Sequence, residues 1–102
     1  MDKIIGEIKS KNTAIDVLIN NAGIIVPKRY DEQTYQNHLK TFAVNYLAPV
    51  HMTLQLKPLL KGHVVTIASI ASLLRGNNLT SYAASKHAIY GFFNCMRVEL
   101  AR

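Results

Sequence analysis

A serine, a tyrosine and a lysine lie at spacings that suit proton transfer to or from a bound molecule. Tyr82 and Lys86 are four residues apart, so in a helix their side chains share one face. A phenol has a pKa of about 10, and a nearby ammonium group lowers that pKa because it favours the phenolate. Such a phenol can exchange a proton with a substrate oxygen, which Ser69 can hydrogen-bond. The tyrosine–lysine pair alone is a weak signal, and the preceding serine makes the pattern specific.

The residues around this trio predict a strand, a loop and a helix. His63 to Ala68 is an apolar run with the β-branched content of a buried strand, and Ser69 ends it. A loop over residues 76–78 follows, and Thr80 or Ser81 is expected to cap a helix that runs to the chain end. The trio is therefore predicted near the carboxyl end of a strand, where open parallel sheets bind ligands.

An asparagine lies inside the long helix that is predicted before this strand, over residues 34–60. An internal asparagine is usually a poor helix former on an exposed face. Here Pro49 follows Asn45 by four positions and has no N–H to donate to its carbonyl, so we expect a kink with a free carbonyl. Pro58 and Gly62 are expected to end the helix before the strand. Its apolar stripe is predicted to pack on the sheet: Leu39, Phe42, Ala43, Tyr46, Leu47, Val50 and Leu54.

The first part of the chain predicts a helix, a strand and a turn of small residues. Met1 to Asn12 carries isoleucines at helical spacing, and Ile15 to Ile19 reads as a strand covered on both faces. Gly23 closes the turn and tolerates a positive φ. In isolation this would be an ordinary turn, although its small residues let the backbone approach a ligand: Asn20, Asn21, Ala22 and Gly23.

These features together resemble the short-chain dehydrogenase/reductase family. In that family a serine precedes the tyrosine of a YxxxK motif by thirteen positions, which is the spacing from Ser69 to Tyr82. The NNAG turn at residues 20–23 and Asn45 in FAVNYLA match two further family motifs in the same order. The resemblance covers residues 1–102. It implies an α/β fold with a Rossmann-type, doubly wound parallel sheet, of which this chain is the central portion.

The resemblance also implies an NAD(P)-dependent oxidoreductase that interconverts an alcohol and a carbonyl, with NAD or NADP as cofactor. Tyr82 would be the general acid/base, and Lys86 would lower its pKa and bind the nicotinamide ribose. Ser69 would hold the substrate oxygen, and the backbone of Asn45 would hold a relay water. The NNAG turn would contact the adenosine side of the cofactor, with sheet support from one asparagine. The implied cofactor-binding set is Asn20, Asn21, Ala22, Gly23, Tyr82 and Lys86.

The sequence departs from the family pattern at both ends. A TGxxxGxG-like turn, which in the family receives the pyrophosphate, is absent, and the glycines are scattered at positions 6, 23, 62, 76 and 91. The strands expected after the last helix are also absent. We therefore expect residues 1–102 to be a partial NAD(P)-binding domain that lacks the phosphate-binding turn and the C-terminal strands. The alternative is a non-catalytic fragment or pseudoenzyme that acts as a binding or dimerisation module.

Composition points to no further partner. The net charge is +6, but the twelve basic residues are spread along the chain, which argues against nucleic acid. The four histidines lack metal-ligand spacing, so we expect no metal site. Cys95 is the only cysteine, and its apolar helix predicts a buried free thiol. That helix is expected to bury a stripe of Ile89, Phe92, Phe93, Met96 and Leu100.

Two phrases, GHVVTIAS and VNYLAP, look most like the retinol and 17-beta hydroxysteroid branch of the family. This likeness implies a lipophilic alcohol as substrate, such as a retinoid or a steroid. A homo-oligomer is expected by analogy with family members that pair helices. The sequence leaves the location open between the cytoplasm and, if the likeness to the retinol and hydroxysteroid branch is right, the endoplasmic reticulum or lipid droplets. Attachment to a membrane would require an N-terminal segment that this chain does not include.

Overall fold

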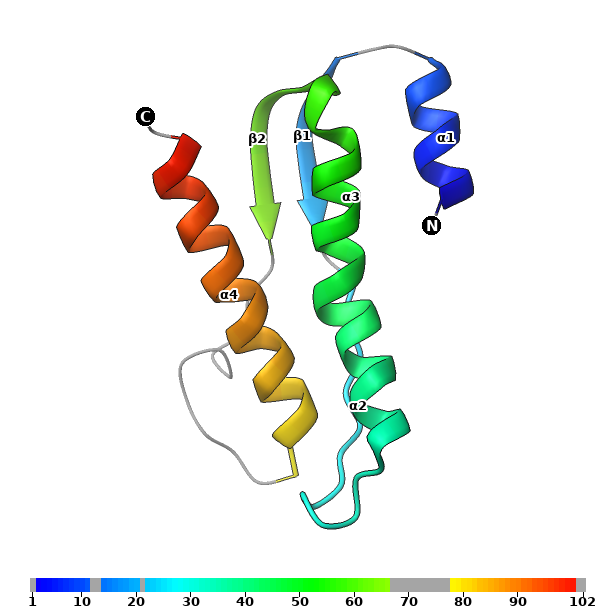
Figure 1. Cartoon of the computed structure of the whole chain (residues 1–102), viewed down its shortest axis with the longest axis vertical. Helices are drawn as coiled ribbons and strands as arrows, with labels where there is room; N and C mark the ends of the chain where they lie inside the picture. Colours follow the sequence, from blue (N-terminus) through cyan, green and yellow to red (C-terminus); the bar gives the residue numbers. More distant parts are fainter. Residues whose placement is uncertain (1, 12–13, 21, 67–77, 101–102) are drawn as a thin grey trace.

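The computed structural model describes residues 2–11, 14–20, 22–66 and 78–100. Two parallel strands and a set of helices form an α/β arrangement, as the family resemblance predicts (Figure 1). In chain order the elements are α1 (Asp2–Ser10), β1 (Ile15–Asn20), α2 (Tyr35–Phe42), the π-helical turn η1 (Ala43–Leu47), α3 (Ala48–Leu56), the 3₁₀ turn η2 (Lys57–Leu59), β2 (Leu60–Thr66) and α4 (Thr80–Leu100). None of the described helices is long and apolar enough to span a membrane.

The two strands pair in parallel and end side by side, with Asn20 opposite Thr66. β2 begins at Leu60, three residues earlier than predicted, so Gly62 lies within the strand instead of ending the helix. The register shifts between Ile15 and Val17, which brings the backbone of β1 against Gly62. A side chain at Gly62 would overlap the carbonyl oxygen of Asp16. Close backbone approach is therefore the reason for a glycine here.

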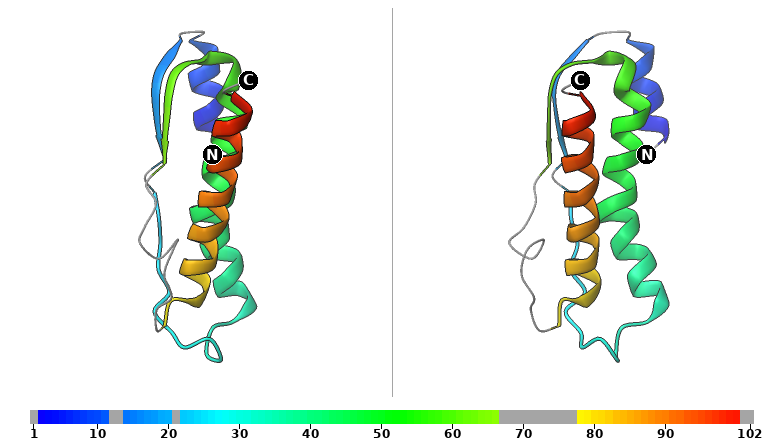
Figure 2. Two further views of the ribbon diagram at one scale, coloured as in Figure 1. Left: turned by 90° about the vertical axis from the view of Figure 1, so that its left-hand side faces the viewer. Right: turned by 60° about the vertical axis from the view of Figure 1, so that its left-hand side comes forward.

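The helices α1, α3 and α4 lie on one side of the sheet (Figure 2). On the other side Val17 and Ile19 are 48% and 59% exposed. The prediction that the first strand is covered on both faces is therefore wrong within the described residues. Its apolar run is typical of a doubly covered strand, but the described helices supply only one layer.

A nearly continuous helix runs through α2, η1 and α3, and its start agrees with the prediction. Thr34 and Asn37 form a capping box, in which Asn37 N donates to Thr34 Oγ1 at 3.1 Å and Thr34 N donates to Asn37 Oδ1 at 2.9 Å. The α-helical part ends at Leu56, four residues before the predicted end, and a 3₁₀ turn containing Pro58 follows. A proline cannot donate the next α-helical hydrogen bond, which accounts for the early end.

The buried face of this helix is largely polar, contrary to the predicted apolar stripe. Its fully buried residues are Thr41, Asn45, Thr53 and Leu56. Three leucines of the predicted stripe are instead exposed: Leu39, Leu47 and Leu54. The hydrogen bonds of the buried polar side chains with α4 and β1 explain why this face can be buried.

Helix α4 begins at Thr80 and packs along α2 and η1. Leu79, and not Thr80 or Ser81, precedes the first turn, and its carbonyl accepts the Ala83 N–H at 2.7 Å. Ile89 is buried as predicted, whereas Leu100 and Cys95 are exposed, so the predicted buried thiol is wrong. These two residues lie in the last turns of a 21-residue helix, where periodicity alone does not show whether a neighbour is present.

Candidate active site

Three of the predicted site residues meet beyond the carboxyl end of β1. A Cβ placed on Gly23 would lie 3.6 Å from Lys86 Nζ and 3.6 Å from Asn45 Oδ1. Gly23 belongs to the turn after β1, Asn45 to η1 and Lys86 to the second turn of α4. Residues that are 22 to 63 positions apart in the sequence are thus brought to one place by the sheet and its two packed helices.

The Asn45 side chain is 2% exposed and satisfies its hydrogen-bonding groups inside the protein. Its Oδ1 accepts the Ile24 N–H at 2.8 Å, and its Nδ2 donates to the Ile24 carbonyl at 2.9 Å. Nδ2 also donates to Ser85 Oγ at 3.0 Å. The side chain therefore clamps the backbone of the turn after β1 and joins it to α4. The sequence analysis predicted no role for this side chain, because the role implied there, holding a relay water, concerns only the backbone.

The Pro49 position shows how an internal proline is accommodated next to Asn45. The Ala48 N–H donates to the Ala43 carbonyl, five residues back, so a π-helical turn surrounds Asn45. Pro49 then lies in the first positions of α3, where a missing N–H is tolerated. The helix is therefore distorted before Pro49, and the distortion is a π-helical turn where the sequence predicted a kink. Single π-helical turns inside α-helices are frequent at functional sites.

Lys86 and Tyr82 lie close together on α4, as their spacing predicts. Lys86 is 7% exposed, which is unusual for a lysine. Its Nζ lies 5.7 Å from the centroid of the half-buried Tyr82 ring. A buried ammonium at this distance places positive charge beside the phenol and beside the turn at Gly23.

Ser85 is a site residue that the sequence analysis missed. It is completely buried, accepts a hydrogen bond from Asn45 Nδ2 and donates one to the Tyr82 carbonyl at 2.8 Å. The available signal was a small polar residue between Tyr82 and Lys86 on the buried side of the helix. That signal alone does not identify Ser85, because its hydrogen bond with Asn45 depends on which helix packs against α4.

The remaining predicted residues divide into three cases. Asn20 points to the helix layer, where Nδ2 donates to Thr53 Oγ1 at 3.5 Å, in keeping with the sheet support expected from one asparagine. Ala22 and Gly23 are exposed after β1. Gly23 does not adopt the positive φ that it would tolerate, since among the described residues only Asn78 has one, at 60°. Ser69 and Asn21 lie outside the described residues.

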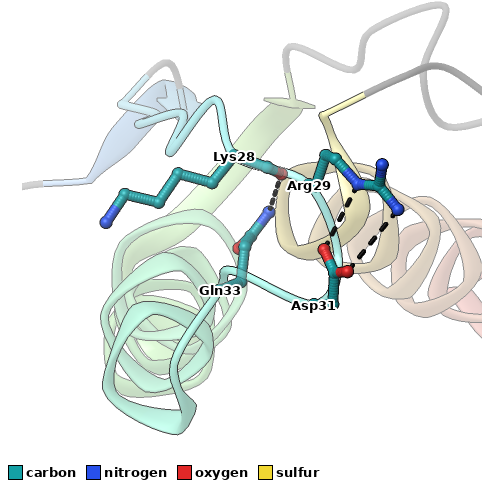
Figure 3. A network of polar contacts seen from close by, with 4 residues as sticks. All are labelled: Lys28, Arg29, Asp31 and Gln33. Carbon is teal, nitrogen blue, oxygen red and sulfur yellow. Dashed lines mark hydrogen bonds and ion pairs between the residues drawn. The ribbon is translucent and has the colours of Figure 1, made fainter.

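The loop between the turn and α2 is tied down near the start of α4. Gln33 Nε2 donates to the carbonyls of Val26 and Lys28, at 3.3 and 3.1 Å. Arg29 pairs with Asp31 at 3.3 Å (Figure 3). The backbone of Lys28 also forms a bridge with that of Leu79. Backbone pairing thus joins this loop to the residue that precedes α4.

Comparison with known proteins identifies the same family. The family model described as short chain dehydrogenase matches residues 1–102. The rat protein "Dehydrogenase/reductase SDR family member 7B" is 38% identical over 90 residues, which are 84% of this chain and 28% of that protein.

Two solved structures share the fold and part of the sequence. A 4-hydroxyisoleucine dehydrogenase complexed with NADH and succinate is 27% identical, with a TM-score of 0.90 over 98% of this chain and 49% of that chain. A Beutenbergia cavernae protein with bound NADP is 32% identical, with a TM-score of 0.89 over 97% of this chain and 41% of that one. The chain spans less than half the length of each protein compared. It belongs to the short-chain dehydrogenase family.

Proposed function

We propose that the protein containing these residues is an NAD(P)-dependent oxidoreductase that interconverts an alcohol and a carbonyl. The observation that carries this proposal is the convergence of Asn45, Gly23 and Lys86 beside Tyr82. A buried ammonium next to a phenol and next to exposed backbone suits proton transfer to a molecule bound over the turn. Family membership and the NADH and NADP in the similar structures support the same conclusion.

A nicotinamide dinucleotide fits the residues at this end of the sheet. Ala22 and Gly23 are exposed and carry little side chain, so a ligand can reach their backbone. The Lys86 ammonium lies next to Gly23 and has three N–H donors, which suit ribose hydroxyls. When bound, the nicotinamide would supply or accept the hydride, and the protein would orient it.

Tyr82 is the proposed general acid/base. In reduction its hydroxyl gives a proton to the substrate carbonyl oxygen, and in oxidation the phenolate takes the proton from the alcohol. Lys86 Nζ lies 5.7 Å from the ring centroid, and its positive charge is proposed to assist this transfer. Ser69 is proposed to hydrogen-bond the same substrate oxygen.

Asn45 is proposed to act through two different groups. Its buried side chain holds the turn at Ile24, while its backbone carbonyl holds a water that passes protons towards Lys86. Pro49, four residues on, has no N–H to offer this carbonyl, which supports its availability for water.

The proposed substrate class is a lipophilic alcohol such as a retinoid or a steroid. The likeness of GHVVTIAS and VNYLAP to that branch of the family supports it. Ile25, in the loop beside the site, is an exposed apolar residue that could contact such a substrate. We also propose that the protein pairs with a second copy, and the exposed Leu39, Leu47 and Leu54 on one helix support this.

The proposal is tested with the protein expressed from its complete coding sequence. Retinol, a hydroxysteroid and a short aliphatic alcohol are each incubated with NAD or NADP, and formation of reduced nicotinamide is followed. Turnover of any of them is the expected result, with the lipophilic alcohols preferred. Cofactor binding without turnover of any of these alcohols would favour a non-catalytic binding module.

A further inference from the structure

Two buried serine hydroxyls on α4 face the helix that carries Asn45. Ser81 and Ser85 are one helical turn apart, and both are 0% exposed. Thr41 Oγ1 donates to Ser81 Oγ at 3.4 Å, and Asn45 Nδ2 donates to Ser85 Oγ at 3.0 Å. Their partners are also four residues apart, so two matching side-chain pairs connect the helices.

The two pairs differ in what lies beyond them. Ser85 Oγ donates onward to the Tyr82 carbonyl at 2.8 Å, and Asn45 continues to both backbone groups of Ile24. An unbroken series of hydrogen bonds therefore runs from the turn after β1, through Asn45 and Ser85, to the backbone of Tyr82. The Thr41–Ser81 pair lies one helical turn further from Lys86, so it provides a matched control for the Asn45–Ser85 pair.

We propose that Ser85 is a positioning residue, which sets where Tyr82 and Lys86 lie relative to Asn45 and Gly23. This inference rests on the proposed function. Ser85 precedes Lys86 in the chain, and Lys86 Nζ and Asn45 Oδ1 approach the same point at Gly23. A slide of α4 along η1 would separate these groups, and a misplacement of about 1 Å can lower a rate by about 10²-fold.

The hydrogen bond, and not only the volume of the side chain, is the feature that the proposal requires. Ser85→Ala removes the hydroxyl, whereas Ser85→Cys fills a similar space with a much weaker hydrogen-bonding group. Ser81→Ala removes an equally buried hydroxyl from the same helix face without breaking the series to Tyr82. The three variants separate positioning from packing.

The experiment uses the protein expressed from its complete coding sequence. Ser85→Ala and Ser85→Cys are expected to lower kcat by about tenfold or more, with a smaller change in the KM for the cofactor and a displaced pH–rate profile. Ser81→Ala is expected to keep kcat within about threefold and an unchanged profile. Equal kcat losses in Ser85→Ala and Ser81→Ala, or full activity of Ser85→Cys, would overturn the inference.

Two parallel measurements keep this outcome distinct from failure of the proposed function. If Tyr82→Phe retains turnover, the acid–base assignment fails; if it is inactive while Ser85→Ala resembles Ser81→Ala, only the Ser85 inference fails. A crystal structure of Ser85→Ala gives an answer that does not depend on activity. Lys86 Nζ displaced from Asn45 Oδ1 would support the inference, and an unchanged arrangement would overturn it.

Discussion

At the scale of single residues, the Asn45 side chain directs its hydrogen bonds into the protein. Asn45 accepts from Ile24 N–H and donates to Ile24 and Ser85, so its amide leaves no donor for a ligand. Lys86 and Tyr82 can then act on a bound molecule while Asn45 holds the scaffold. In the proposed reaction the buried amide of Asn45 and the phenol of Tyr82 would therefore not compete for the same hydrogen-bond partner.

Gly62 carries a residue-scale prediction about the sheet. Gly62→Ala would drive a methyl group into the Asp16 carbonyl oxygen and within 2.9 Å of its carbonyl carbon. Both atoms belong to the backbone, so they cannot rotate away, and we expect a loss of about 1–3 kcal/mol in the free energy of unfolding. Denaturant unfolding of the complete protein measures this change.

Gly91→Ala is the matched control for Gly62→Ala. Gly91 lies within α4, and a Cβ there meets nothing within 4 Å. Alanine in a helix interior is expected to raise the free energy of unfolding by about 0.5–1 kcal/mol. Similar effects of the two variants would show that the close approach of β1 and β2 does not constrain position 62.

At the scale of elements, the π-helical turn reconciles Pro49 with a helix that must run past the site. A proline inside a regular helix costs about 3 kcal/mol, whereas one in the first turn of a helix costs little. Here the π-helical turn from Ala43 to Leu47 lies between α2 and α3, so Pro49 falls at the start of α3. The buried polar face then presents Thr41 and Asn45 to α4.

Pro49→Ala tests whether this arrangement serves the reaction. Alanine supplies an N–H that can bond the Asn45 carbonyl, which would compete with the proposed relay water. We expect kcat to fall by up to about 10²-fold with no loss of thermal stability. Pro58→Ala, in the 3₁₀ turn at the far end of α3, is the control and should keep kcat. Wild-type kcat in Pro49→Ala would remove the support for a relay through Asn45.

The contact between α1 and α3 carries a prediction about pH. The hydrogen bond from His51 to Asp2, 2.9 Å long, and the charge of His51 lower the pKa of the Asp2 carboxyl below its ordinary 3.8. A carboxyl with a lowered pKa contributes stability above its ordinary pKa and loses it as pH falls through the lowered value. Lowering the pH through that value should therefore weaken the contact between α1 and α3. NMR titration of Asp2 measures this pKa.

His51→Gln provides the comparison for the Asp2 titration. It should return the Asp2 pKa towards 3.8, because the positive charge is lost and a neutral amide is a weaker hydrogen-bond donor to a carboxylate. Lys9→Met, which removes a further polar contact between the two helices, at Gln55, should leave the pKa unchanged. An Asp2 pKa that is the same in wild type and His51→Gln would contradict this account of the contact.

How far the sequence predicted these elements depends on whether a feature is local. Tyr82, Lys86 and the Thr34 helix start were predictable because spacing and capping chemistry are encoded in neighbouring residues. The buried polar face of α2 to α3 and the exposure of Cys95 were not, since they depend on which surfaces meet across the fold. Ser85 belongs to this second group, because its role exists only through Asn45.

At the scale of the whole molecule, the part of the chain that the structure describes is less compact than an ordinary domain of about this length. The radius of gyration is 15.0 Å, against about 13 Å expected for a compact domain of this size. Among the described residues, no helix covers the second face of the two-stranded sheet (Figure 2), and Val17 and Ile19 are exposed. Exposed apolar strands favour aggregation unless further chain or a partner covers them.

This shape predicts that residues 1–102 alone neither unfold cooperatively nor bind cofactor well. Two strands expose too much apolar surface for independent stability. The pyrophosphate would also lack the glycine-rich turn that receives it in this family. Hydrogen exchange and titration with NADH and NADPH measure both properties, with the product of the complete coding sequence as control. A monomer with a cooperative transition and micromolar cofactor affinity would contradict this expectation.

The central claim is that Tyr82 carries the acid–base chemistry of an NAD(P)-dependent oxidoreductase. The most direct measurement is the turnover of Tyr82→Phe beside its cofactor affinity, in the product of the complete coding sequence. The phenol has only its hydroxyl to lose, so we expect kcat to fall by ~10²–10⁴-fold while cofactor binding stays close to that of the wild type. Turnover of Tyr82→Phe within about threefold of wild type would contradict the account.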